Sequence, residues 1–188
     1  APGVKEIHNG ADDNGSGTVT VLEGARALAC HSYRNTVRFL NVTGEEQGLF
    51  GSDAYATAAR QRGDDIRGVL NFDMPGWEGD LIPNPENLDV SYNSFSQWLG
   101  ELFAQNATTY STGLVVDAFS CPSLTASDHA SFWDQGYPAI IGITDNENYC
   151  GHGGNYPYYH TSSDTIANNG NPAFFHAVVR ATVATLAE

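Results

Sequence analysis

Apolar residues recur along the chain in two periods, and segments of one period alternate with segments of the other. The spacing of apolar side chains predicts helices over residues 18–30, 49–60, 94–106, 127–135 and 172–186. Short apolar runs predict buried strands over residues 36–42, 67–74, 113–117 and 138–144. This order indicates an α/β fold of layers, with a largely parallel sheet flanked by helices.

Length and charge narrow the classes of function. The chain has 188 residues, enough for one domain with a sizeable core. Its net charge is −14, which argues against partners that are nucleic acids or anionic membranes. No apolar run approaches the ~20 residues of a membrane span. No signal peptide is visible, although a mature secreted chain would have lost one.

The three cysteines carry limited information about the compartment. Cys30 closes an apolar helical run and is expected to be a buried thiol. Cys121 and Cys150 lie in loop-type sequence, and we expect them to form a disulfide, which would indicate an extracytoplasmic protein. Two unrelated free thiols are the alternative.

Two adjacent glutamates, Glu45 and Glu46, stand between a predicted strand and a predicted helix. Open α/β sheets place ligands at this position. Neighbouring like charges repel, and a cation relieves the repulsion, so one carboxylate can bind a metal while the other acts as a base on metal-bound water. The alternative is an acidic first turn favoured by the helix dipole.

Three further stretches offer metal-ligand chemistry. Asp12 and Asp13 lie in a glycine-rich turn that opens a helix, and Asp73 ends a buried strand. His160 can donate an imidazole nitrogen to zinc, with Asp164 as a partner that orients it. Each has a simpler reading: a helix N-cap, an acid capping a turn, and an exposed histidine. Together, however, these oxygen and nitrogen donors match the ligand set of a two-zinc hydrolase.

The motifs that carry these residues resemble those of the secreted co-catalytic dizinc aminopeptidases, which are leucyl-aminopeptidase-like zinc exopeptidases. That family also contains glutaminyl cyclases and non-enzymatic receptor ectodomains. The matching stretches are Gly-Ala-Asp-Asp-Asn-Gly-Ser-Gly, Glu-Glu-x-Gly-Leu-x-Gly-Ser, Asn-x-Asp-Met, Ser-Asp-His and Tyr-His-Thr-x-x-Asp-Thr. The resemblance runs from residue 10 to the end and implies a three-layer zinc-exopeptidase fold.

The resemblance also implies a role for each matching residue. Asp13 resembles the aspartate that bridges two zinc ions, and Asp73 resembles a ligand of one of them. Glu46 and His160 look like ligands of the other zinc. The remaining roles fall outside the ligand set: general base for Glu45, polarisation of the scissile carbonyl for Tyr159, and support of the ligands for Asp12 and Asp128.

One departure concerns the second zinc. Family members take a histidine for it from a His-x-Asp motif upstream of the bridging aspartate, and this chain has no such motif before Asp13. We therefore expect residues 1–188 to be the C-terminal portion of a zinc-peptidase domain, whose N-terminal part has been cleaved off, has been lost, or is a separate segment that completes the domain. The alternatives are that His8 fills the position or that the site holds a single zinc.

The expected function is zinc-dependent removal of N-terminal residues from peptides, by a secreted or periplasmic enzyme. Two alternatives use the same scaffold: a glutaminyl-cyclase-like enzyme with one zinc, and a receptor-like binding domain without catalysis. Retention of Glu45 and of four expected ligands favours the peptidase. The sequence does not indicate which N-terminal residue is preferred.

Overall fold

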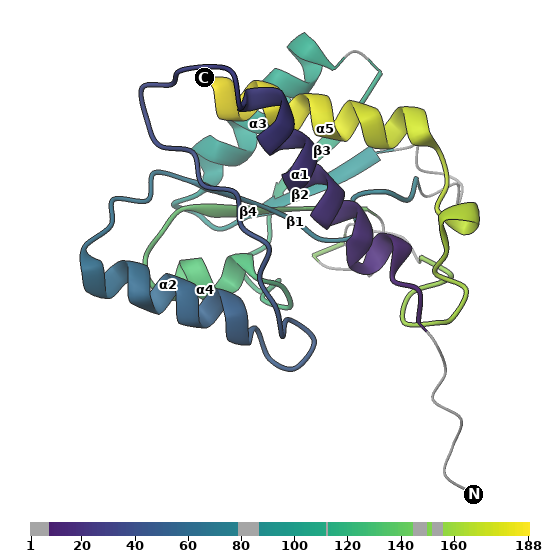
Figure 1. Cartoon of the computed structure of the whole chain (residues 1–188), viewed down its shortest axis with the longest axis horizontal. Helices are drawn as coiled ribbons and strands as arrows, with labels where there is room; N and C mark the ends of the chain where they lie inside the picture. Colours follow the sequence, from purple (N-terminus) through teal and green to yellow (C-terminus); the bar gives the residue numbers. More distant parts are fainter. Residues whose placement is uncertain (1–7, 79–86, 112, 145–149, 152–155) are drawn as a thin grey trace, which may run out of the picture.

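A four-stranded sheet lies between two layers of helices in the computed structural model of the chain (Figure 1), which describes residues 8–78, 87–111, 113–144, 150–151 and 156–188. Helices α1 (Gly17–Leu28), α3 (Gln97–Tyr110) and α5 (Pro172–Ala187) cover one face. Helices α2 (Phe50–Arg62) and α4 (His129–Asp134) cover the other. The three-layer α/β fold is therefore confirmed. Within the described residues, no helix is both long and apolar enough to cross a membrane.

The sheet has the strand order β1-β4-β2-β3. β1 (Val69–Phe72) pairs in parallel with β4 (Ala139–Ile143), and β2 (Asn87–Tyr92) pairs in parallel with β3 (Val115–Ser120). The contact between β2 and β4 is antiparallel, so the sheet is mixed and mostly parallel, as expected. β2 is a strand that the sequence analysis missed, although all six of its residues are buried.

The main core fills the space between the sheet and helices α3 and α5. Phe103, Leu88 and Val178 are completely buried there and belong to one cluster. Gly100 permits this packing, because a Cβ at that position would lie 2.4 Å from the ring of Tyr92. Burial of this apolar face is what drives the helices onto the sheet.

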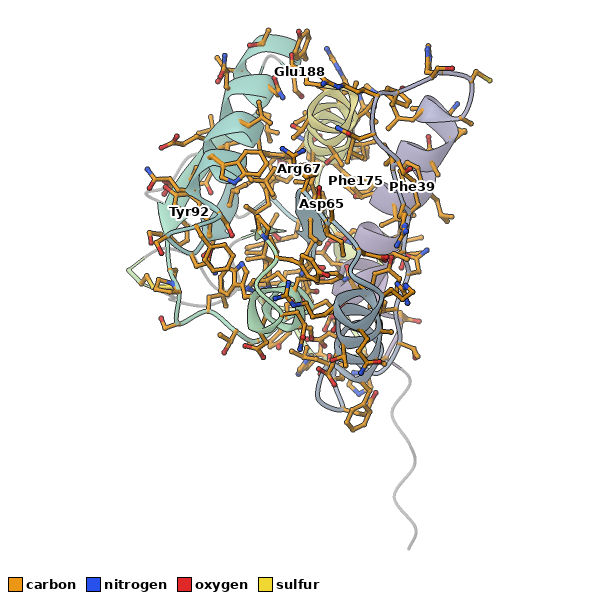
Figure 2. The ribbon with its side chains drawn as sticks, turned by 90° about the vertical axis from the view of Figure 1, so that its left-hand side faces the viewer. Phe39, Asp65, Arg67, Tyr92, Phe175 and Glu188 are labelled. Carbon is orange, nitrogen blue, oxygen red and sulfur yellow. A yellow bond between two sulfur atoms is a disulfide. The ribbon has the colours of Figure 1, made fainter. Side chains whose placement is uncertain are left out.

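The strand predicted over residues 36–42 is wrong, because no strand is assigned there. A strand needs a hydrogen-bonded neighbour, and a cavity of about 460 Å³ lies between this segment and β1. The cavity is lined by Phe39 and Leu40 from the segment and by Val69 and Leu70 from β1. Figure 2 labels Phe39 together with Asp65 and Arg67, which also line it. The apolar pattern was real, but among the described residues the sheet edge and this segment do not pair.

Of the two predictions about the cysteines, one is confirmed and one is wrong. Cys121 and Cys150 form a disulfide, with Cα atoms 5.9 Å apart, so this prediction is confirmed. Cys30 was expected to be buried but is exposed and free. The reason is that α1 ends at Leu28, so Cys30 no longer follows the helical face that packs against the core.

Candidate metal centre

The polar residues singled out in the sequence come from four separate segments that meet at one end of the sheet. Asp73 directly follows β1. His160 lies in the loop region after β4, which runs parallel to β1 and therefore ends at the same edge of the sheet. Glu45 and Glu46 lie in the turn before α2. Asp13 lies in the turn η1 (Ala11–Ser16) that opens α1. Parallel strands bring the residues that follow them to a shared edge, where α/β folds place their ligands.

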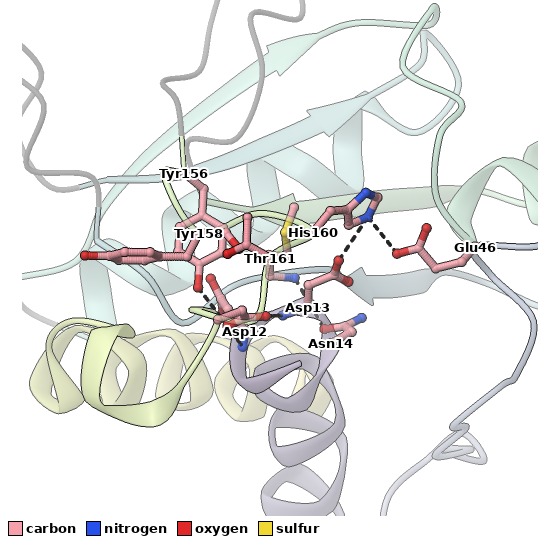
Figure 3. Close-up of polar contacts among 10 residues, drawn as sticks. Asp12, Asp13, Asn14, Glu46, Tyr156, Tyr158, His160 and Thr161 are labelled. Atoms are coloured by element: carbon pink, nitrogen blue, oxygen red, sulfur yellow. Dashed lines mark hydrogen bonds and ion pairs between the residues drawn. The ribbon is translucent and has the colours of Figure 1, made fainter. Parts of the chain in front are cut away.

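Three of these side chains point toward one another (Figure 3). The Nε2 atom of His160 lies 2.8 Å from Oε1 of Glu46 and 3.3 Å from Oδ2 of Asp13. One ligand atom from each residue lies within 4.8 Å of the others. Zinc–ligand bonds of ~2.1 Å in a tetrahedron place ligand atoms roughly 3.4 Å apart, close to this spacing. Two carboxylate oxygens and one imidazole nitrogen therefore fit a zinc ion in both chemistry and geometry.

His160 is held in an unusual backbone conformation. Its φ angle is 55°, in the left-handed region that non-glycine residues rarely adopt. The ring of Tyr159 stacks on the imidazole, with centroids 3.7 Å apart and planes 26° apart. Local strain that persists through surrounding contacts is characteristic of functional sites. The loop thus presents the imidazole toward Asp13 and Glu46.

Asp164 has a different contact from the one that the sequence suggested. It was expected to orient His160, but its carboxylate oxygens instead accept hydrogen bonds from the backbone N–H groups of Asp12 and Asp13, at 2.9 and 3.0 Å. The hydroxyl of Tyr156 donates to the same carboxylate at 2.8 Å. Asp164 therefore fixes the turn that carries Asp13.

Asn14 is a residue whose contribution the sequence analysis missed. Its amide donates to the carbonyl of Phe72 at 3.0 Å and accepts from the N–H of Met74 at 3.3 Å. These two residues flank Asp73, so one side chain ties the Asp13 turn to the end of β1. Gly17 makes room for this contact, because a Cβ there would lie 2.2 Å from the Asn14 side-chain oxygen. An asparagine inside a turn-rich acidic stretch was the available signal.

The carboxylates of this region are crowded, and the charges of three of them raise the pKa of Asp13. Burial, then the charges of Asp73 and Glu46, raise the pKa of Asp13 to about 7. Burial and the charges of Asp73 and Glu46 likewise raise the pKa of Glu45 to about 8. Burial raises the pKa of Asp73 to about 6. Such shifts are typical of functional sites, and a bound divalent cation would offset them.

These shifts predict a pH dependence for the metal-free protein. The folded-state pKa values of Asp13 and Glu45 lie above their ordinary values of 3.8 and 4.5. Between the ordinary and the folded-state values, the folded state therefore binds more protons than the unfolded state. Stability must then fall as pH rises through the folded-state values. We expect a lower Tm at about pH 8.5 than at about pH 5.5 after chelation, and saturating zinc should reduce the difference, because its ligands bind deprotonated. A Tm of the chelated protein that rises with pH would contradict this assignment.

The other residues proposed from the sequence lie around the three-residue group. Asp12 is completely buried, and its Oδ1 accepts hydrogen bonds from the hydroxyl of Ser16 and the N–H of Gly76. Asp128 has a buried Oδ1 without a hydrogen-bond partner, and its charge contributes to the raised pKa of Glu45. His8 is exposed and does not belong to the group of Asp13, Glu46 and His160.

Residues 2–186 match peptidase family M28. A probable leucine aminopeptidase of Arthroderma otae is 35% identical over 178 residues, which are 90% of this chain and 45% of that protein. The zinc aminopeptidase BSAP of Bacillus subtilis is 26% identical with a TM-score of 0.73, covering 95% of this chain and 43% of that one.

A glutaminyl cyclase of Porphyromonas gingivalis shares the fold, with a TM-score of 0.68 and 20% identity over 96% of this chain and 64% of that one. At this identity the likeness shows the fold alone. The chain spans less than half the length of the leucine aminopeptidase relative and of the Bacillus subtilis enzyme.

Proposed function

Because this chain belongs to peptidase family M28, we propose that its protein is a zinc-dependent aminopeptidase that removes N-terminal residues from peptides. The observation that carries this proposal is the convergence of Asp13, Glu46 and His160 from three segments, with ligand atoms within 4.8 Å of one another. The likeness to leucine aminopeptidases supports the same activity.

Each nearby residue has a distinct proposed role. Zinc, when bound by Asp13, Glu46 and His160, supplies a Lewis acid that acidifies water and polarises a carbonyl oxygen. Glu45 takes the proton of the attacking water and returns it to the nitrogen of the leaving amine, so that the peptide bond is exchanged for a carboxylate and a free amine. The phenol of Tyr159 steadies the negative charge that develops on the carbonyl oxygen. Asp73 is proposed as a ligand of a second zinc.

The surplus of carboxylates supports the choice of an N-terminal substrate. A peptide's α-ammonium group is a cation that this acidic site attracts, whereas an internal peptide bond brings no such charge. Acetylation of the substrate's amine should therefore prevent cleavage, which gives the activity test an internal control.

The activity test uses the purified protein and a peptide with N-terminal leucine. We expect release of free leucine, its loss after chelation, its recovery on addition of zinc, and no cleavage of the acetylated peptide. A peptide with N-terminal glutamine separates the alternative: release of ammonia without free glutamine would indicate a glutaminyl cyclase. Zinc binding without either reaction would favour a receptor-like domain, and absence of zinc binding would contradict the proposal.

The open edge of the sheet supports a further part of the proposal. Among the described residues, β1 has no strand on its outer side, and the cavity there is lined by apolar residues of both the 36–42 segment and β1, as a missing strand would leave. A second hollow of about 320 Å³ connects Leu40 and Leu70 to Asp13 and Asp73. We propose that an extended segment carrying a histidine occupies this edge and completes a second zinc site. The number of zinc ions bound per chain, with and without such a segment, tests this part.

The disulfide supports a proposal about location. Cys121 is completely buried while Cys150 lies in an exposed turn, and the bond joins them across 29 residues. Disulfides persist in oxidising compartments and are rare in the cytosol. We therefore propose that the protein works outside the cytoplasm, in the periplasm or after secretion.

A further inference from the structure

Asp164 is a carboxylate that is almost completely buried, with 2% of its surface exposed. Burial of a charge is costly unless hydrogen bonds compensate for it. Here three donors converge on it: the N–H groups of Asp12 and Asp13 and the hydroxyl of Tyr156, all at 2.8–3.0 Å. Figure 3 shows the Tyr156 side chain approaching the turn of Asp12 and Asp13. A buried carboxylate that accepts three hydrogen bonds fixes the positions of the groups that donate them.

The turn that Asp164 holds needs an external acceptor. Asp13 and Asn14 have non-helical backbone angles, and Gly10, which precedes the turn, provides no side-chain cap. The N–H groups at the start of a helix lack partners within the helix. Hydrogen bonds to a charged acceptor are shorter and stronger than neutral ones. The Asp164 carboxylate therefore replaces the missing cap and fixes the backbone from which the Asp13 side chain projects.

The same loop also carries His160. Asp164 follows it by four residues, and its N–H donates to the carbonyl of Thr161 at 3.2 Å, closing a turn directly after the histidine. The carbonyl of Asp164 accepts a further bond from the N–H of Ala11 at 3.4 Å. One short loop thus carries the imidazole and also accepts a hydrogen bond from the backbone N–H of Asp13.

We propose that Asp164 is a positioning residue that sets the separation between the Asp13 carboxylate and the His160 imidazole, and so the affinity of the site for zinc. Tyr156 acts through it by fixing the orientation of the Asp164 carboxylate. This inference rests on the proposed function only in taking zinc as the metal that Asp13, Glu46 and His160 bind. Outer partners of metal ligands commonly change metal affinity ~10–100-fold when they are removed.

Zinc titration against a competing chromophoric chelator tests this role in the full chain. Asp164→Asn keeps the side chain's volume but turns an N–H group toward a backbone donor, and we expect zinc affinity to fall ~10–100-fold. Tyr156→Phe removes a single hydrogen bond and should weaken zinc binding roughly fivefold. Because Tyr156 acts through Asp164, the double variant should lose little more than Asp164→Asn alone. Unchanged affinity in Asp164→Asn, or fully additive losses, would overturn the inference.

Two control variants separate positioning from general stability. Asp134→Asn changes an exposed aspartate on α4 and should alter neither Tm nor zinc affinity. Val178→Ala creates a cavity at a completely buried position on α5, so it should lower Tm while zinc affinity at a temperature well below Tm stays unchanged. If Val178→Ala weakens zinc binding as much as Asp164→Asn does, the role of Asp164 is merely structural.

Amide hydrogen exchange separates failure of this inference from failure of the proposed function. Absence of zinc binding by the unmodified protein would overturn the function. In that case the metal-free protein still decides the role of Asp164. The amides of Asp12 and Asp13 should exchange slowly in the unmodified protein and faster in Asp164→Asn, and equal exchange in both would overturn the inference.

Discussion

Replacement of Glu45 by glutamine is expected to reduce kcat for peptide cleavage by ~10²–10⁴-fold, which is the usual contribution of a general base. Glutamine has nearly the same shape but cannot accept the proton of the attacking water. Glu45 lies outside the group of Asp13, Glu46 and His160, so zinc content should stay unchanged. Steady-state kinetics together with elemental analysis of the same sample measure both quantities.

The matched control for this variant is Glu101→Gln on α3, where the glutamate is exposed. It should leave both kcat and zinc content unaltered. Glu45→Gln that retains full activity would remove Glu45 from the mechanism. Loss of zinc together with activity would instead make Glu45 a ligand.

His160→Ala is expected to weaken zinc binding by more than ~100-fold, since loss of a direct ligand should exceed the ~10–100-fold effect of removing an outer partner. The imidazole nitrogen lies 2.8 Å from Glu46 and 3.3 Å from Asp13, so it stands beside both other ligands. Its removal leaves the carboxylates of Asp13 and Glu46 without the imidazole nitrogen as a third metal ligand. Activity should disappear at limiting zinc and return in part at high zinc concentration.

His176→Ala is the control, because this histidine is exposed on α5. It should bind zinc as the unmodified protein does. Equal zinc affinity in His160→Ala and the unmodified protein would show that the metal binds elsewhere.

The ligand candidates could be predicted from the sequence because their chemistry is local. Glu45 and Glu46 are adjacent, and Asp13 lies in a turn whose composition is recognisable. Resemblance to family motifs implies a role for each of these residues without any distance. The sequence could not show that these residues lie together in the fold, since His160 and Glu46 are 114 residues apart.

The errors have physical causes of the same kind. Residues 36–42 have the apolar pattern of a buried strand, but a pattern describes side chains and does not show whether a partner strand is present. β2 was missed because it buries the polar residues Asn87, Asp89 and Ser91 along with its apolar ones. The position of Asp164 depends on backbone N–H groups more than 150 residues away, which no local spacing indicates.

We expect Asp13, Glu46 and His160 to hold a zinc ion. A crystal structure of the zinc-loaded protein, with anomalous diffraction measured on both sides of the zinc absorption edge, tests it most directly. We expect an anomalous peak about 2.0–2.2 Å from an oxygen of Asp13, an oxygen of Glu46 and Nε2 of His160. A second peak between Asp13 and Asp73 would support the two-zinc site. Zinc peaks only at other residues, or no zinc peak in zinc-saturated crystals, would show that these three residues do not form a zinc site.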